Sequence, residues 1–299
     1  MNEVYHIPAL LKETIEGLNV HKEGIYVDVT FGGGGHSRAI LKADAGHLYS
    51  FDQDRDVLKN AIEDERWTFV HSNFRYLRNW MDYYGVEGID GLLADLGVSF
   101  HHFDCPERGF SFRFSAPLDM RMNQTAKRTA ADIVNGYSEE ELAKIFYLYG
   151  ELKNGRQIAK NICKARSQKA IERTEELVAA SRIPAEMSKE LARLFQSLRI
   201  EVNDEMGALR EMLVAARDLL KPGGRIAILT YHSLEDRLVK NFLRSGNLEG
   251  TIEKDFYGNN LSPFTLIEKG REASEEEVER NPRARSAKLR VAEKLKIKN

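Results

Sequence analysis

Two hydrophobic periods alternate along the first third of the chain. Short apolar runs are separated by stretches in which apolar residues recur every three or four positions. The runs predict strands, and the intervening stretches predict helices. Strands that alternate with helices indicate βαβ units and a parallel sheet. The predicted strands cover 25–30, 47–52, 67–74 and 88–97, and the predicted helices cover 37–43, 56–64 and 76–85.

The pattern changes near residue 98. Residues 98–137 are rich in aromatic residues and arginine, have weak periodicity, and are typical of a long functional loop. Several helical stretches follow, and Ser138 and Glu141 have the spacing of a capping box at the start of the first. Alternation then returns with a helix that we expect Asn203 to cap. The last predicted elements are a strand at 225–231, a helix at 233–246 and an edge strand at 264–270.

These changes predict a doubly wound α/β domain interrupted by an insertion. We expect the α/β domain to comprise residues 1–104 and 206–299, and the mainly helical insertion to comprise residues 105–205. A chain of 299 residues has room for both. The insertion is expected to recognise the substrate.

Four glycines, at 32–35, join the first predicted strand to the first helix. Such a turn brings backbone N–H groups and the positive end of a helix close to a ligand. The sequence lacks the G-x-x-x-x-G-K-[ST] pattern of a phosphate-binding loop. Arg38 occupies the third position of a G-x-G-x-x-G pattern, where a bulky side chain disfavours the helix–strand packing of dinucleotide sites. A plain structural turn also remains open.

Two companions extend the glycine signal. Asp52 ends the second predicted strand, where a carboxylate accepts hydrogen bonds from the ribose of NAD or of S-adenosylmethionine. Residues 219–224, LLKPGG, lead from a helix directly into a buried strand, as in class I methyltransferases before their fifth strand. The sequence therefore favours a class I, Rossmann-like methyltransferase over a nicotinamide-dependent oxidoreductase.

Composition narrows this picture only slightly. The net charge of −2 argues against a protein whose only task is to coat nucleic acid, although a local basic face is compatible with it. Cys105 and Cys163 form no CxxC pair, and His101 and His102 lack zinc-site spacing, so we expect reduced thiols and no metal. We find no targeting peptide and no membrane-spanning apolar run, and we expect a cytoplasmic protein of undetermined oligomeric state.

Six sequence blocks, in order, resemble the RsmH (MraW) family of bacterial methyltransferases. They are DLGVS (95–99), ERGFSFRF (107–114), PLDMRM (117–122), FQSLRIEVNDE (195–205), HSLEDR (232–237) and NPRARSAKLR (281–290). The resemblance runs from HIPALL near the start to the basic C-terminal segment. It implies S-adenosyl-L-methionine as cofactor, methylation of N4 of a cytidine in 16S rRNA, and 16S rRNA or the small ribosomal subunit as partner, with no role for a membrane.

The same resemblance implies a set of cofactor contacts. His102 stands where the family has a glutamine, and the stretch 183–194 before FQSLR also departs from the family pattern. The implied cofactor residues are Gly34, Gly35, His36, Asp52, Phe74, Asp95 and His102.

Methyl transfer to the amino group of cytosine suggests a role for Asp95. The amine is a poor nucleophile because its lone pair is delocalised into the ring, and an acceptor for an amino hydrogen would help it to pyramidalise. Asp95 ends the fourth predicted strand, although no Pro-Pro-aromatic follows it. It is either a catalytic residue or a cofactor contact alone.

The substrate side is expected to use the loop after this strand. A base in structured RNA must be unstacked to reach the cofactor. The phenylalanines and arginines of residues 98–137 suit binding of single-stranded RNA, although several of the phenylalanines are expected to anchor the loop. Ser233 and Asp236 have capping-box spacing. The basic C-terminal segment is either a solvated surface or an RNA contact. A non-catalytic RNA-binding assembly factor is a further alternative. The candidate substrate residues are Ser99, Arg108, Asp119, Arg121 and His232.

Overall fold

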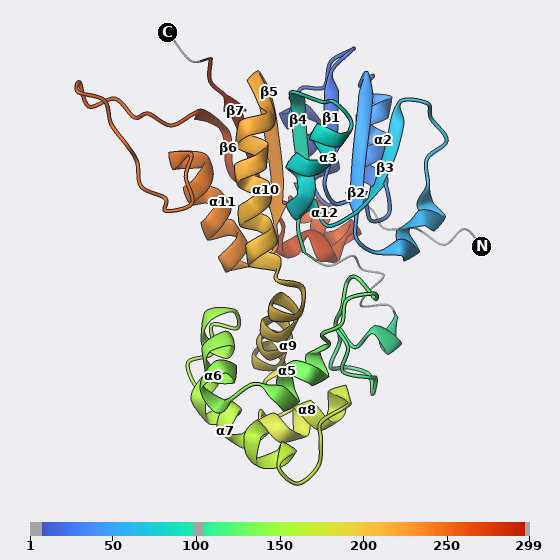
Figure 1. Ribbon diagram of the computed structural model, residues 1–299, viewed down its shortest axis with the longest axis vertical. Helices are drawn as coiled ribbons and strands as arrows, with labels where there is room; N and C mark the ends of the chain where they lie inside the picture. Colours follow the sequence, from blue (N-terminus) through green and yellow to red (C-terminus); the bar gives the residue numbers. More distant parts are fainter. Residues whose placement is uncertain (1–7, 98–104, 297–299) are drawn as a thin grey trace. The chain divides into compact units, whose positions relative to one another are not determined.

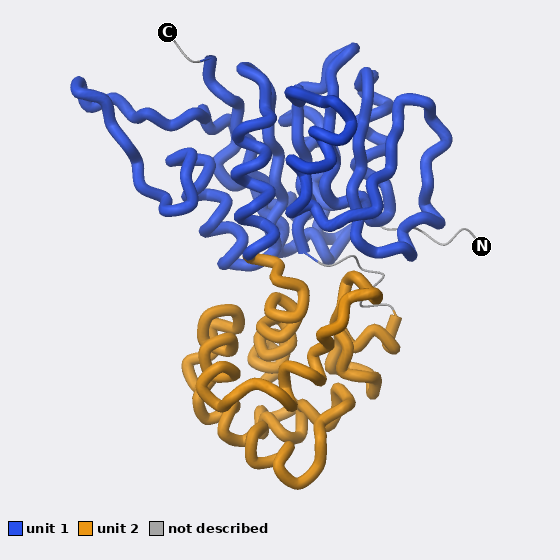
Figure 2. The backbone as a smooth tube through the Cα atoms, in the orientation of Figure 1, with its two compact units in different colours: residues 1–97, 207–299 blue, residues 98–206 orange. Residues whose placement is uncertain are grey.

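The structure is a computed structural model that describes residues 8–97 and 105–296. It divides into two compact units, one made of residues 1–97 and 207–299 and the other of residues 98–206 (Figure 2). No helix in these described ranges is both long enough and apolar enough to span a bilayer.

The first unit is built on a seven-stranded sheet in the order β3-β2-β1-β4-β5-β7-β6 (Figure 1). Strands β1 to β5 pair in parallel, and β7 lies antiparallel between β5 and β6. The predicted parallel sheet and the predicted edge strand are confirmed. The strands are β1 (Ile25–Asp28), β2 (His47–Asp52), β3 (Trp67–His71), β4 (Ile89–Asp95), β5 (Leu220–Thr230), β6 (Phe264–Glu272) and β7 (Lys288–Lys294).

Helices cover both faces of this sheet. Side chains of α1 and α2 join Tyr26, Leu93 and Leu229 in a buried core on one face. Figure 1 shows α3, α10 and α11 in front of the other face. The helices are α1 (Leu11–Leu18), α2 (Gly35–Lys42), α3 (Leu77–Tyr83), α10 (Glu205–Leu219), α11 (Ser233–Ser245) and α12 (Glu275–Arg280), with short 3-10 turns η1 (Arg55–Asn60), η2 (Phe74–Tyr76) and η4 (Pro282–Ser286).

The helix predicted over residues 56–64 is reduced to the 3-10 turn η1. Asp54 begins this turn by accepting a hydrogen bond from the backbone N–H of Asp56. The carbonyl of Asn60 accepts from the guanidinium of Arg38, and the Asn60 amide donates to the carbonyl of Gly32. These contacts with the glycine turn end the helical path at Asn60.

The basic C-terminal segment is an internal strand rather than a tail. Leu289 and Val291 of β7 are buried against the sheet core, and Arg225 of β5 pairs with Glu293. Residues 288–294 are therefore not a solvated tail, and an RNA contact by the basic side chains of the segment stays a prediction. Polar and apolar residues alternate in KLRVAEK with the period of a strand, and this pattern could have predicted β7 from the sequence.

The second unit is helical and has its own core. Phe146, Ile158, Leu177 and Leu194 are among its fully buried side chains. The capping box predicted at Ser138 and Glu141 is confirmed, with reciprocal bonds of 3.2 and 2.7 Å. The elements are η3 (Pro106–Arg108), α5 (Ala130–Gly136), α6 (Glu139–Leu148), α7 (Gly155–Arg166), α8 (Thr174–Ser181) and α9 (Ser188–Asn203).

The expectation that Asn203 caps a helix is wrong. Asn203 is the last residue of α9, and Asp204 takes a left-handed conformation before α10 starts. The Asn203 side chain instead binds the long loop that precedes α5. Its amide donates to the carbonyl of Met120 and its oxygen accepts from the N–H of Met122, both at 2.8 Å. The Asn203 side chain therefore bonds to a loop distant in sequence, although its local spacing had predicted a helix cap.

We predict that the ion pair between Arg290 and Asp236 stabilises the first unit. Arg290 of β7 is buried and binds both carboxylate oxygens of Asp236 on α11, at 2.8 and 3.0 Å. Burial alone would raise the pKa of Asp236, but the guanidinium outweighs it and the net pKa is lowered. Arg290→Met should reduce the free energy of unfolding by about 2–3 kcal/mol at pH 7, measured by urea titration.

This loss should shrink as the pH falls below about 4, because a carboxyl whose folded pKa is lowered contributes stability only while it is ionised. Arg78→Met is the matched control, since Arg78 and Asp82 form an exposed pair. It should change stability little. An equal loss in the two variants would contradict a specific contribution from Arg290.

Candidate active site

A buried carboxylate anchors the turn after β1. Asp28 is fully buried and accepts hydrogen bonds from the hydroxyl of Ser37 at 2.6 Å and the N–H of Thr30 at 3.0 Å. Ser37 also lies 2.8 Å from the hydroxyl of Ser50 on β2. Burial raises the pKa of Asp28, and these bonds oppose the shift. Sequence reasoning missed Asp28, although an acid inside the apolar run YVDV was a signal.

The glycine turn has a geometry that side chains would disturb. Gly34 precedes α2 with a φ of +74°, which favours glycine. A Cβ built there would lie 2.5 Å from Nη1 of Arg38 and 2.9 Å from Cε2 of Phe31. A Cβ on Gly35 would lie 2.3 Å from Cγ of Pro8. Both positions are therefore restricted to glycine by the protein itself.

We expected the bulky side chain of Arg38 to disfavour the helix–strand packing of a dinucleotide site, and that reason is wrong. The Arg38 side chain does not enter the helix–strand contact, because it is exposed and donates to the carbonyls of Gly33 and Asn60 at 2.8 and 2.6 Å. Ser37 fills the buried position beside the strand. Arg38 therefore braces the turn from outside and does not discriminate between nucleotide ligands.

Asp52 lies beside this turn at the end of β2. One carboxylate oxygen accepts from the N–H of Gly32 and the other from the N–H of Asp54, each at 2.9 Å. Burial raises its pKa to about 6 despite these bonds, and the neighbouring acids Asp54 and Asp28 add to the rise. Phe74 follows at the same edge of the sheet, because it opens η2 directly after β3.

Asp95 ends β4 within the same group of side chains. Its backbone N–H donates to the hydroxyl of Thr30 at 2.7 Å, and its Oδ1 accepts from the Tyr231 hydroxyl at 2.7 Å. Its Oδ2 lies 3.5 Å from Nδ1 of His36. Burial raises the pKa of Asp95 to about 7, and the charge of Glu235 adds to that rise while the Tyr231 bond opposes it. Tyr231 is a second residue that sequence reasoning missed.

His36 is buried at the start of α2. Burial lowers its pKa, so the ring is neutral at pH 7. Its Nε2 has no hydrogen-bond partner among the described residues. A buried polar nitrogen without a partner is costly in a folded protein, so His36 stays a candidate cofactor contact, although the backbone of Ala9 also bonds its ring.

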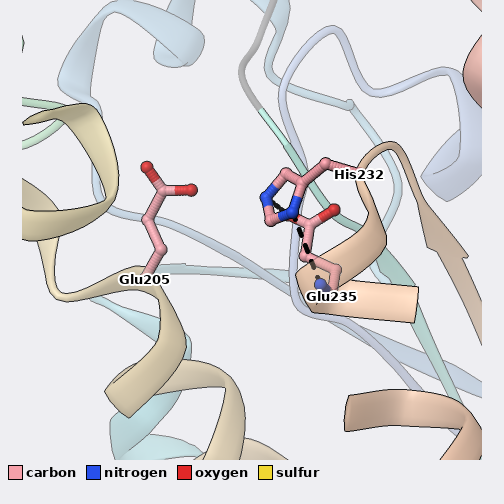
Figure 3. Close-up of side chains that lie close together, drawn as sticks. All are labelled: Glu205, His232 and Glu235. Atoms are coloured by element: carbon pink, nitrogen blue, oxygen red, sulfur yellow. Dashed lines mark hydrogen bonds and ion pairs between the residues drawn. The ribbon is translucent and has the colours of Figure 1, made fainter. Parts of the chain in front are cut away.

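His232 follows β5 and also has a structural role. It is the N-cap of α11, where its Nδ1 accepts from the N–H of Glu235 at 3.4 Å, and its Nε2 lies 3.1 Å from the Glu235 carboxylate (Figure 3). The capping box expected at Ser233 and Asp236 is therefore wrong, because Ser233 is already inside the helix and Asp236 binds Arg290. Glu205, also drawn in Figure 3, pairs with Arg199 of the helical unit at 2.8 Å.

The candidate substrate residues of the helical unit order its long loop. Asp119 and Arg121 form a two-point ion pair at 2.8 and 2.6 Å, which lowers the pKa of Asp119 although burial opposes the shift. Buried Arg108 donates to the carbonyls of Arg121 and Met122. Ser99 and His102 lie outside the described residues.

The phenylalanines of this loop divide between core and surface. Phe110 is buried, and Phe112 packs edge-to-face on Phe195 with ring centres 5.6 Å apart. Phe114 is 49% exposed. The expectation that several of them anchor the loop is confirmed for Phe110 and Phe112, and Phe114 is available for stacking.

The fold and the acids at its carboxyl edge define a class I, Rossmann-like methyltransferase. The chain belongs to the MraW methylase family, whose model matches residues 3–295. This confirms the resemblance found in the sequence, and S-adenosylmethionine is the cofactor. The match does not favour a nicotinamide-dependent oxidoreductase or a non-catalytic assembly factor.

Full-length relatives carry a more specific name. Proteins called ribosomal RNA small subunit methyltransferase H are 59% identical in Phocaeicola vulgatus and in Parabacteroides distasonis, covering 97–98% of this chain and 98% of each relative. The protein of the same name in Cytophaga hutchinsonii is 52% identical and is covered over its whole length.

The residues at the carboxyl edge fit this cofactor. Asp52 keeps lone pairs beyond its two backbone bonds, and a carboxylate there suits ribose hydroxyls. Gly34 and Gly35 allow close approach of the backbone. His36 presents an unpartnered nitrogen, and Asp95 supplies a carboxylate for a cationic group.

We predict that binding of S-adenosylhomocysteine depends on ionisation of Asp52. Ribose hydroxyls donate to the ionised carboxylate, so the Asp52 contribution to affinity should rise about tenfold per pH unit below a midpoint of about 6 and then level off, separate from any contribution of Asp95 with its pKa of about 7. Isothermal titration calorimetry between pH 5 and 7.5 measures this. Asp52→Asn should weaken binding and remove that rise, whereas Asp95→Asn should keep it. A rise that persists in Asp52→Asn would assign the titration to another group.

We predict that Gly34→Val prevents cofactor binding while the protein still folds. The positive φ should lower the free energy of unfolding by about 1–2 kcal/mol, and the contacts with Arg38 and Phe31 should displace the turn. S-adenosylhomocysteine affinity should fall more than tenfold. Gly85→Val is the matched control, because Gly85 has a φ of +68° with nothing within 4 Å of its Cβ. It should be destabilised yet bind normally, and normal binding by both variants would disprove the role of Gly34.

Proposed function

We propose that the protein transfers the methyl group of S-adenosylmethionine to N4 of a cytidine in the 16S RNA of the small ribosomal subunit. The observation that carries this proposal is the family match over residues 3–295, with relatives named for small-subunit ribosomal RNA at up to 59% identity over almost the whole chain. The atom and the base rest on the family resemblance of the sequence blocks.

The first unit holds the cofactor in this proposal. Bound S-adenosylmethionine supplies an electrophilic methyl group. Asp52 accepts hydrogen bonds from its ribose, the N–H groups of the glycine turn at Gly34 and Gly35 approach it, and Phe74 covers it from the end of β3. His36 donates or accepts through its unpartnered Nε2. His102 belongs to the same set by sequence alone.

Asp95 is the residue that acts on the nucleophile. Its ionised carboxylate accepts a hydrogen bond from the N4 amino group, which frees the nitrogen lone pair for attack on the methyl carbon. S-adenosylmethionine held by the first unit would give up its methyl group to this nitrogen, with its sulfur as the leaving group. The proton released from N4 passes to Asp95 and then to solvent. A pKa of about 7 suits an acceptor that must also release the proton.

The helical unit recognises the RNA in this proposal. Arg108, Asp119 and Arg121 hold the long loop in shape, as their mutual and backbone bonds indicate. Exposed Phe114 offers a face on which an unstacked base can lie. Ser99 and His232 are the remaining proposed substrate residues, and His232 acts by fixing the start of α11.

The test is methyl transfer from labelled S-adenosylmethionine to small subunits, or to 16S RNA, from a strain that lacks the enzyme. Mass spectrometry of the labelled fragment should show one N4-methylcytidine. Absence of transfer to both substrates by folded protein that binds S-adenosylhomocysteine would refute the proposal.

We predict that Asp95→Asn lowers kcat by about 100-fold or more, because the amide is a poor proton acceptor. The wild-type rate should rise with pH through about 7 as Asp95 ionises. Asp90→Asn is the matched control at the other end of β4, where Asp90 binds the N–H of Ile25 and the amine of Lys221. It should keep both the rate and the pH profile. Full activity of Asp95→Asn would leave Asp95 as a cofactor contact only.

A further inference from the structure

The hydroxyl of Tyr231 is aimed at Asp95 from the neighbouring strand. Tyr231 directly follows β5, which pairs with β4 so that Asp95 lies opposite Leu229. The hydroxyl donates to Oδ1 of Asp95 at 2.7 Å. Burial, together with the nearby carboxylates, raises the pKa of Tyr231 well above its ordinary value, so it remains a donor at any working pH.

Tyr231 is held through its backbone and through its ring. Its backbone N–H donates to Oε2 of Glu235 at 3.0 Å, and Glu235 is itself buried in the first turn of α11. The ring packs next to Gly97, where a Cβ would lie 3.2 Å from Cδ2 of the ring. Gly97 has a φ of +104°, so a glycine both permits this turn after β4 and leaves space for the ring. The hydroxyl therefore has a fixed direction.

Titratable groups face Asp95 and its Tyr231 partner from several elements, including Glu277 of α12, which adds to the raised pKa of Tyr231. His36 of α2 lies 3.5 Å from its other oxygen and is neutral. Glu235 on α11 acts through its negative charge, which opposes ionisation of Asp95, and buried Asp28 lies close by on β1. Tyr231 thus donates a short hydrogen bond to the Asp95 carboxylate, and this bond opposes the rise in pKa that burial and Glu235 cause.

We propose that Tyr231 is a positioning residue for the methyl-transfer reaction, which keeps Asp95 ionised and directs its second oxygen to the substrate amino group. This inference rests on the proposed function of Asp95. By occupying Oδ1, the phenol leaves Oδ2 as the oxygen that accepts from the substrate. By donating to the charged form, it favours the carboxylate over the neutral acid.

The test compares Tyr231→Phe with the wild type in two measurements. Titration of the Asp95 carboxyl carbon by NMR needs no RNA and no turnover, and the midpoint should move up by about one pH unit in Tyr231→Phe. The pH profile of kcat should move in the same direction, so that the rate at pH 6.5 falls several-fold and most of it returns at pH 8.5. Affinity for S-adenosylhomocysteine at pH 8.5 should stay within about twofold.

Tyr26→Phe is the matched control. The Tyr26 hydroxyl is also held by a protein hydrogen bond, accepting from the N–H of His21 at 2.9 Å, but it lies on β1 away from Asp95. This variant should leave the Asp95 midpoint and the kcat profile unchanged. An unmoved Asp95 midpoint in folded Tyr231→Phe would overturn the inference. A moved midpoint in a protein whose wild type methylates no RNA would instead refute the proposed function alone.

Discussion

The arrangement of side chains at the carboxyl edge of the sheet depends on the burial of Asp28. A charged group inside a sheet is tolerated only when its oxygens are bonded, and Ser37 and Thr30 supply those bonds. Ser37 is in the first turn of α2, so the same bond fixes where the helix starts and how the glycine turn runs. Thr30 also accepts from the N–H of Asp95, so the end of β4 is tied to the end of β1.

The carboxyl groups at this edge all have pKa values raised by burial. Asp28, Asp52 and Asp95 all have raised pKa values, and burial is the largest cause in each. Such an arrangement is costly in the protein alone and favourable for a ligand that brings positive charge. The sulfonium and the amino group of S-adenosylmethionine are both cationic, so the proposed cofactor contacts would offset part of this cost.

Much of this site could be predicted because local pattern and topology agree there. Asp52 and Asp95 end strands of a parallel sheet, and parallel strands bring their carboxyl ends to one edge. The glycines follow the first strand. Tyr231 was missed because its role depends on Asp95, a partner far along the chain. Asp28 was missed although its partners Thr30 and Ser37 are near in sequence, because the acid was read as part of an apolar strand. Local spacing also failed at Asn203, where a tertiary partner holds the side chain, and at Ser233, where the preceding residue His232 caps the helix and Asp236 binds Arg290.

The place of β7 in the sheet has a consequence for synthesis on the ribosome. All other strands precede it in the chain, yet it lies between β5 and β6 and joins them. Val291 of β7 also packs on Gly17 of α1, near the opposite end of the sequence. During translation β6 therefore has no partner strand, and α1 has an incomplete surface, until residues 288–294 have left the exit tunnel. The nascent enzyme should bring its first and last elements together in one late step.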